Sequence, residues 1–478
     1  MKNRYIKTLI ASLILVFGYS FLSAQESTTL YFMRGVPQSD LQNPALHNDS
    51  SAVVVGLPGL SGMSVGLNSP FAFRDLFHKG TGDYADSLVT DMESFHRALK
   101  STNSVQQNFT VPLFYLGFRH KKSFFSLGIS EKEVAQLTFA KNMVTFIKDG
   151  NAPYMGQNFD LGDIQMNAIH YREFALGYSN ELIKNKLTVG IKVKALYGKS
   201  ALQTERMDLQ VETAADGSYL NLRSDMKINL SAPVTASFDS VNYFSGLENG
   251  NDNPKDYMLQ HENKGMAFDL GAVYKLTPKI TLSGSIIDMG KISFKKDVIS
   301  IDHVSNYKWE GIDFSKSLDD TKPDYVSQSD LIDNEMTKFG NSFKPKKSEF
   351  GTEAFKMTIP TKIYLGGTYQ FTDKFNLGLL DRLYKYGEMS KNTLTLSANT
   401  MLGEYFSLSG SYSVVGNSYN NLGLGMGIRC GFMQLYMVSD NLLAMDPAKA
   451  EMVNFRFGIN LLFGRKHAYQ PIVEKGLE

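Results

Sequence analysis

Seven charged residues lie at alternate positions of strand-like runs, a pattern typical of the polar lining of a β-barrel pore. The set comprises Lys192, Lys194, Asp269, Lys275, Lys362, Arg429 and Arg456. Because six of the seven are cations, one interpretation is a lumen that attracts anionic solutes. The other, which we favour, is that carboxylates such as Asp40 and Asp49 pair with these cations and that the charges fill the interior without selecting a solute.

The sequence argues against catalysis and against a metal site. The eight histidines show no paired spacing on one strand face, and His303 and Ser305, which share a face, stand near a polar loop. Cys430 is the only cysteine, so neither an intramolecular disulfide nor a multi-cysteine metal site can form. The glycines at 423, 425 and 427 precede no helix pattern, so we interpret them as clearance for a plug or a bend rather than as a phosphate-binding loop. We therefore predict no enzymatic activity and no cofactor.

The N-terminus and the composition indicate an exported envelope protein. Three basic residues within the first seven positions precede an apolar stretch at 9–22, which is the pattern of a secretory signal, and we predict cleavage after Ala24. An uncleaved anchor is the alternative, although the stretch is short and is interrupted by polar residues. The formal net charge of +1 argues against a nucleic-acid partner.

The run from Val453 to Gly464 alternates strictly between apolar and polar side chains. Its apolar face carries Val453, Phe455, Phe457, Ile459, Leu461 and Phe463, and its polar face carries Asn454, Arg456, Gly458 and Asn460. Since successive side chains of a strand point to opposite sides of the sheet, one face meets an apolar medium and the other meets water. Similar runs recur from about residue 52 onward. The sequence therefore predicts an all-β fold, an antiparallel transmembrane β-barrel.

A count of the strand-like runs gives 16 strands, and 14 is nearly as well supported. The pair of runs at 204–213 and 217–230 is the weakest and could be a hairpin outside the barrel wall. An even number places both termini in the periplasm. The predicted division is a signal peptide at 1–24, an N-terminal luminal hatch segment at 25–51, the barrel at 52–464 and a periplasmic tail at 465–478. Three long connections are predicted outside the cell, and the last of them contains a polar stretch, Asp324 to Lys338, that could form a short helix.

Two resemblances refine this prediction. Asn43-Pro44-Ala45 follows the predicted mature N-terminus and resembles the same element in FadL-type long-chain fatty acid transporters, in which the N-terminal segment folds into the lumen as a hatch. Most of the chain resembles a family of uncharacterised Bacteroidota outer-membrane barrels usually placed near FadL. That likeness is carried by the runs from Tyr171 to Ser179, Lys186 to Gly198 and Ser283 to Gly290, and by SDNLLAMDP with the closing NFRFGINLLFG. It implies a porin-like or hydrophobic-compound transporter with no assigned substrate.

The resulting hypothesis is a passive outer-membrane transport protein that is plugged near its periplasmic end by about residues 26–50. Its predicted partners are outer-membrane lipid and a hydrophobic or anionic small molecule. The alternative belongs to another functional class: a structural or accessory barrel whose loops dock secretion or surface-assembly proteins of the envelope.

Overall fold

The structure is a computed structural model that describes residues 28–33, 35–47, 51–82, 85–250, 253–318, 321–403, 405–416, 418–442 and 449–465. The predicted signal peptide, Asp49 and the predicted tail beyond residue 465 lie outside the described residues. Among the described helices, none is both long enough and apolar enough to cross a membrane.

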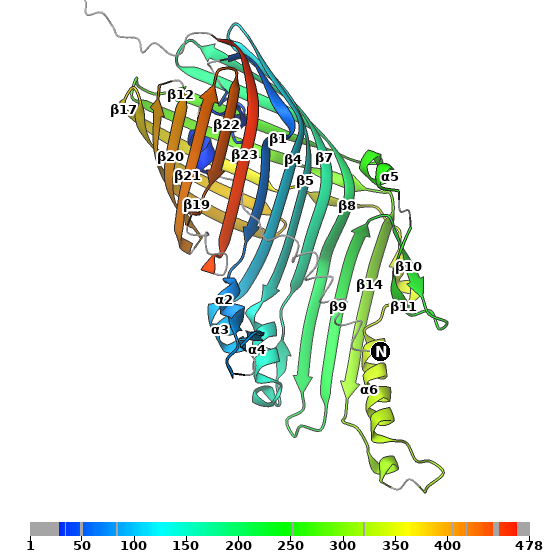
Figure 1. Cartoon of the computed structure of the whole chain (residues 1–478). Helices are drawn as coiled ribbons and strands as arrows, with labels where there is room; N and C mark the ends of the chain where they lie inside the picture. Colours follow the sequence, from blue (N-terminus) through cyan, green and yellow to red (C-terminus); the bar gives the residue numbers. More distant parts are fainter. Residues whose placement is uncertain are drawn as a thin grey trace, which may run out of the picture.

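Fourteen antiparallel strands close into a barrel, because β1 pairs with β4 on one side and with β23 on the other (Figure 1). In order round the ring they are β1 (Ser51–Asn68), β4 (Thr102–His120), β5 (Ser123–Ala140), β7 (Ile164–Ile183), β8 (Leu187–Thr213), β12 (Asn263–Lys275), β13 (Ile280–Phe294), β17 (Thr361–Thr372), β18 (Phe375–Tyr386), β19 (Met389–Leu402), β20 (Phe406–Val415), β21 (Ser418–Cys430), β22 (Met433–Ser439) and β23 (Met452–Arg465). We call the end where β1 begins and β23 ends the turn end, and the opposite end the loop end.

The count of 16 strands is wrong, and the alternative of 14 is confirmed. β8 runs unbroken through residues that the sequence had divided into two strands, and its second half leaves the ring to pair with β9 (Leu220–Ser231). The stretch at 279–301, which counts as a single strand in the sequence-based total of 16, divides into β13 and β14 (Val298–Trp309), and β14 pairs with β9. Three strand segments form an extension sheet that projects beyond the loop end (Figure 1): β9, β14 and the second half of β8.

The remaining elements lie in the connections at the loop end. They are α2 (Phe73–Leu76), β2 (Phe77–Lys79), β3 (Leu88–Thr90), α3 (Met92–Ala98), α4 (Lys141–Asp149), η4 (Ala152–Tyr154), β6 (Asn158–Asp160), β10 (Val234–Phe238), β11 (Phe244–Asn249), α5 (Pro254–Leu259), η5 (Ser315–Ser317), α6 (Gln328–Ser342), η6 (Lys347–Glu349), β15 (Phe350–Gly351) and β16 (Phe355–Thr358). The polar stretch at 324–338, which could form a short helix by its sequence, overlaps α6, which begins at Gln328 and ends at Ser342. It packs against the extension sheet, where the Tyr307 hydroxyl donates to Glu335 at 2.5 Å and the ring of Phe339 contacts Tyr307.

The two faces of the barrel wall differ as the alternation of the closing strand predicts. On β23, the four residues of the predicted polar face are buried, whereas Phe455 and Phe463 on the apolar face are 41% and 43% exposed. Large apolar side chains are likewise exposed on the outside of most other strands, for example Leu365 of β17 and Leu396 of β19. An apolar exterior around a polar interior is the surface pattern of a transmembrane β-barrel.

Candidate functional site in the barrel lumen

The described residues between Thr28 and His47, here called the N-terminal segment, lie inside the ring, where Figure 1 shows them in blue. They form two short 3-10 helices, η1 (Thr29–Phe32) and η2 (Pro37–Leu41), whose side chains are almost all buried. The backbone N–H groups of Thr28 and Thr29 donate to the Asp440 carboxylate beside β22, at 2.6 and 3.0 Å. On the other side of the lumen, the Tyr31 hydroxyl donates to Ser283 of β13 at 3.0 Å. The segment therefore reaches across the lumen.

Asn43 fixes the last turn of the N-terminal segment to the barrel wall. Its Nδ2 donates to the carbonyl oxygens of Ala272 on β12 and Gly284 on β13, at 3.3 and 3.2 Å, and to the Tyr31 hydroxyl at 3.1 Å. Its Oδ1 accepts from the Ala45 N–H at 2.9 Å. Since Asn43 has no exposed surface, these bonds replace all of its contacts with water.

Glycines in the wall leave space for the backbone of the same turn. A Cβ added to Gly190 of β8 would lie 2.5 Å from both the carbonyl carbon and the carbonyl oxygen of Pro44, and 2.7 Å from the Ala45 nitrogen. A Cβ on Gly271 of β12 would overlap with Asn43 and lie 2.8 Å from Pro44. Larger residues at these two positions would therefore displace the turn.

The glycines at 423, 425 and 427 face the other end of the N-terminal segment. A Cβ on Gly423 would lie 2.7 Å from Thr29 Oγ1, and one on Gly425 would overlap with Met33. Gly427 lies farther away, with Val36 3.8 Å from its added Cβ. The glycine stripe of β21 thus lies against η1, and no phosphate-binding turn or helix follows it.

Lys192 links the wall to the N-terminal segment. Its Nζ lies 3.0 Å from Asp40 Oδ2, and the Tyr115 hydroxyl of β4 donates to the same oxygen at 3.0 Å. Lys192 and Asp40 are both buried, so each neutralises the charge of the other away from water. Asp40 is one of the two carboxylates that the sequence offered as partners, and the other, Asp49, lies outside the described residues.

A buried network of three lysines and three carboxylates fills the next layer toward the loop end. Its members are Lys132, Glu173, Lys194, Asp269, Asp288 and Lys362. Lys194 Nζ lies 2.7 Å from Asp269 and 2.5 Å from Asp288, and Lys362 Nζ lies 2.8 Å from Asp288. Lys132 pairs with Glu173 at 2.8 Å. Equal numbers of opposite charges make this layer neutral, and its cations pair with carboxylates of the wall itself.

Three members of this network were missed by the sequence analysis. The alternation of β7, with Phe174, Leu176 and Tyr178 outward, could have placed Glu173 inward. Asp288 carried no such signal, because it interrupts the alternation of β13: its φ is 59°, and both it and Ile287 are buried.

An apolar layer lies still closer to the loop end. Its members include Val134, Ile169, Tyr171, Leu196, Ile292, Phe294, Met357, Tyr384 and Tyr386, which come from both sides of the ring. Gln106 of β4 donates to the Tyr384 hydroxyl of β18, and these two strands lie on opposite sides of the barrel. A cavity of about 30 Å³ between Lys132, Lys362, Tyr171 and Tyr384 is too small for any solute larger than water. Wall side chains from opposite strands thus meet across the lumen in this layer.

The other predicted lining residues differ in their surroundings. Lys275 is exposed at the last position of β12, at the turn end. Arg429 is buried, and its Nε donates to the Gly431 carbonyl oxygen at 3.3 Å. Arg456 is 4% exposed, and its Nη2 donates to Ser64 Oγ at 3.2 Å. Its Nε and Nη1 contact no acceptor among the described residues.

His303 and Ser305 lie in the extension sheet and have separate partners. His303 Nδ1 lies 3.0 Å from Glu349 Oε2, whereas the Ser305 hydroxyl donates to the Ser342 carbonyl oxygen at 2.6 Å. The structure therefore gives no sign of a histidine-activated serine here. Within the described ranges, no group of three or more His, Cys, Asp or Glu side chains is arranged to hold a metal ion.

The outer surface is hollowed opposite Asn43 and Pro44. This depression has a volume of about 540 Å³, and its lining comes from five neighbouring strands and includes the apolar residues Ile191, Leu270, Ile286 and Leu365. Gly190 and Gly271, which contact the N-terminal segment from the wall, also line it. Only the thickness of the strand backbone separates the depression from the segment.

Among solved structures, the chain is similar to several barrels at low sequence identity. The CymD monoaromatic hydrocarbon channel is 11% identical, with 90% of this chain and 94% of that chain covered and a TM-score of 0.38. A Pseudomonas aeruginosa FadL homologue is 11% identical, with coverages of 92% and 96% and a TM-score of 0.36. The KdgM porin is 9% identical, with coverages of 63% and 98% and a TM-score of 0.24.

A search of curated proteins finds no match to this sequence. The model of a family of unknown function, DUF5723, matches residues 44–440, which is most of the chain. The chain therefore belongs to this family of unknown function.

Proposed function

We propose that this protein is a gated outer-membrane channel for small hydrophobic or amphipathic solutes and that the N-terminal segment is its plug. The observation that carries the proposal is the fit of that segment to the lumen, with Asn43 bonded to two strands and Gly190 leaving room for Pro44. A segment that served only as a tether would need neither feature. The contacts of the N-terminal segment with the wall are non-covalent, so the segment can leave the lumen without cleavage of a covalent bond.

The proposed orientation places the turn end in the periplasm and the loop end outside the cell. In outer-membrane barrels the periplasmic connections are short and the external ones long. Here the short connections, such as the one between His120 and Ser123, share an end with the start of β1, and the connection from β13 to β17 belongs to the other end. The predicted signal peptide and an apolar exterior support the same membrane.

The charges of the lumen favour a solute of low charge. Because the cations of the middle layer are paired with Glu173, Asp269 and Asp288, a passing anion would have to separate buried ion pairs. Among the predicted cations that are buried, Arg456 keeps two donors without an acceptor in the described residues, which suits the polar end of an amphipathic molecule. We therefore infer an apolar or amphipathic substrate rather than a free inorganic anion.

Solute uptake by a porin-depleted Gram-negative host that expresses the protein tests this proposal. We expect faster uptake of a labelled monoaromatic hydrocarbon and of a medium-chain carboxylic acid, and unchanged uptake of a small sugar, relative to a host with an empty vector. If the barrel is folded in the outer membrane and all three rates equal those of the empty vector, the transport proposal is wrong.

The extension sheet favours a second candidate function, the docking of envelope proteins. It carries α6 away from the barrel, and on and beside this helix Ile332, Met336 and Leu318 are 43%, 57% and 79% exposed. Such side chains beyond the membrane suit a protein partner. Deletion of residues 310–349 would then abolish co-purification of an envelope protein without changing solute uptake. An unchanged set of co-purified proteins would contradict this candidate.

A further inference from the structure

Three lysines share one patch of the barrel exterior near the loop end. They are Lys264 of β12, Lys291 of β13 and Lys356 of β16. Ser293 of β13 pairs with Lys264 on one side and with Lys356 on the other, and Lys291 lies two residues before Ser293 on the same strand. Paired residues, and residues two apart on one strand, point to the same side of a sheet, so the three side chains project together.

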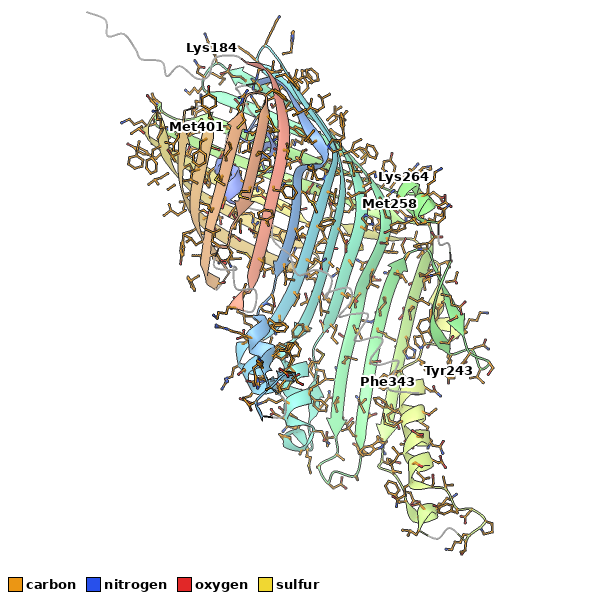
Figure 2. The ribbon with its side chains drawn as sticks, in the orientation of Figure 1. Lys184, Tyr243, Met258, Lys264, Phe343 and Met401 are labelled. Carbon is orange, nitrogen blue, oxygen red and sulfur yellow. The ribbon has the colours of Figure 1, made fainter. Side chains whose placement is uncertain are left out.

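The side to which they project is the exterior. All three lysines are exposed, whereas Ile292 and Phe294, at the alternate positions of β13, have no exposed surface and belong to the apolar layer of the lumen. Figure 2 shows Lys264 next to α5, where the ring passes into the extension sheet. The patch thus lies at the boundary between the barrel wall and the external loops.

The charges of these lysines are not neutralised by the described part of the chain. None of the three makes an ion pair or a side-chain hydrogen bond there, and the adjacent Glu262 pairs with Lys296 at 2.7 Å. Neighbouring strands are about 4.8 Å apart, so the backbones of Lys264 and Lys356 lie about 10 Å from each other. Their long side chains can therefore reach the same anionic group between them.

An apolar surface continues from the lysines toward the turn end. Met266, which pairs with Lys291, is 56% exposed, and Phe268 and Leu270 follow on β12 with 36% and 45%. Leu270 borders the 540 Å³ depression, and it lies four residues, about 13 Å, along the strand from Met266. If the lysines lie among lipid head groups, this distance places the depression in the hydrocarbon layer.

We propose that this surface binds an anionic lipid with a phosphorylated head group. The ammonium groups of Lys264, Lys291 and Lys356 hold the phosphate, and an acyl chain fills the depression beside Leu270. Lysine binds phosphate as a point charge, and each lysine near an anionic membrane surface contributes about 1 kcal/mol, or about five-fold in affinity. The inference rests on the proposed membrane location, but it does not depend on transport.

Native mass spectrometry of the full chain, released from nanodiscs of phosphatidylglycerol and phosphatidylcholine in equal amounts, tests the proposal. The lysine variant is Lys264→Gln/Lys291→Gln/Lys356→Gln, and its matched control is Lys316→Gln/Lys322→Gln/Lys344→Gln, in the connection beyond the barrel. A third variant, Gly284→Val, narrows the depression while leaving the lysines in place, since a Cβ on Gly284 would lie 3.5 Å from Leu365.

We expect the wild type and the control to retain phosphatidylglycerol in preference to phosphatidylcholine, and the lysine variant to lose this preference. Gly284→Val should retain less of both lipids. Equal retention of the two lipids by the wild type, or an unchanged preference in the lysine variant, would overturn the proposal. Inorganic phosphate that binds the detergent-solubilised wild type as tightly as the lipid does would also overturn it, because the patch would then be a free-anion site. Failure of the wild type to insert into nanodiscs would refute the membrane location itself.

Discussion

The substitution Gly190→Ala tests whether the N-terminal segment is held by the space that the wall leaves for it. The added Cβ would lie 2.5 Å from two atoms of Pro44, whereas ordinary carbon contacts lie at about 3.5–4.0 Å. The turn must therefore move by about 1 Å or leave its place. Overpacking of this kind costs about 1–3 kcal/mol, which shifts the equilibrium between the seated and displaced segment by about 5- to 150-fold. Gly190 does not have a positive φ, so backbone strain adds nothing.

Thiol labelling measures this displacement directly. In a Cys430→Ser background, Ala45→Cys places a single thiol on the turn, at a position that is 5% exposed. We expect Gly190→Ala to raise its labelling rate with a water-soluble maleimide in proportion to the displaced population. The matched control is Gly410→Ala on β20, whose added Cβ would meet no atom within 4 Å. Unchanged labelling in Gly190→Ala, or an equal rise in Gly410→Ala, would refute the reasoning.

Three further predictions concern the network, the exterior and the loop end. Lys194→Met leaves Asp269 and Asp288 short of a buried partner and should lower the free energy of unfolding in urea by about 3–5 kcal/mol, whereas the exposed Lys275→Met should have little effect. Phe457→Arg places a charge on the lipid face and should destabilise the folded barrel by about 2–4 kcal/mol near the bilayer midplane, which reduces the yield of heat-modifiable folded barrel on gels. A yield equal to that of the wild type would mean that the register of β23 is wrong. A hydrogen bond with Asp208, together with burial, raises the pKa of Asp163 at the loop end to about 6. The raised pKa therefore stabilises the folded state fully below the ordinary pKa of 3.8, and this stabilisation is lost as the pH rises through 6. Asp208→Asn should flatten the pH dependence of the free energy of unfolding between pH 4 and 7. A pH dependence equal to that of the wild type would contradict this prediction.

The sequence predicts the barrel well because its signal is local. Each strand alternates between a lipid-like exterior and a polar interior, and Phe455 and Arg456 of β23 lie on the faces that the alternation indicates. The strand count failed where this alternation breaks. The register of β7 with β8 shifts by one residue beside Ser200, and the register of β8 with β9 shifts after Thr204. The alternation of β8 is interrupted at these shifts, so the sequence predicts two strands where the structure has one.

The lumen could be predicted only in part, because its pairings join residues far apart in the chain. Alternation places Lys192 and Lys194 inward, and the sequence offered Asp40 as a partner of such cations, as the structure has it for Lys192. The sequence could not show that Asp288 faces inward, since a bulge in the pairing of β12 with β13 changes the direction of the side chains there. Nor could it show that Tyr384 meets Gln106 across the barrel, because this contact depends on the cross-section of the closed ring.

Single-channel recording in planar bilayers tests our central proposal, which is that the barrel is shut at two levels. These levels are the N-terminal segment and the layer around Tyr171 and Tyr384. The account predicts that the wild type shows no steady conductance and that deletion of residues 28–47 alone leaves the layer around Tyr171 and Tyr384 closed. This deletion combined with Tyr171→Ala and Tyr384→Ala should yield stable open steps. A wild-type protein that conducts steadily, or a combined variant that is folded and remains silent, would contradict it.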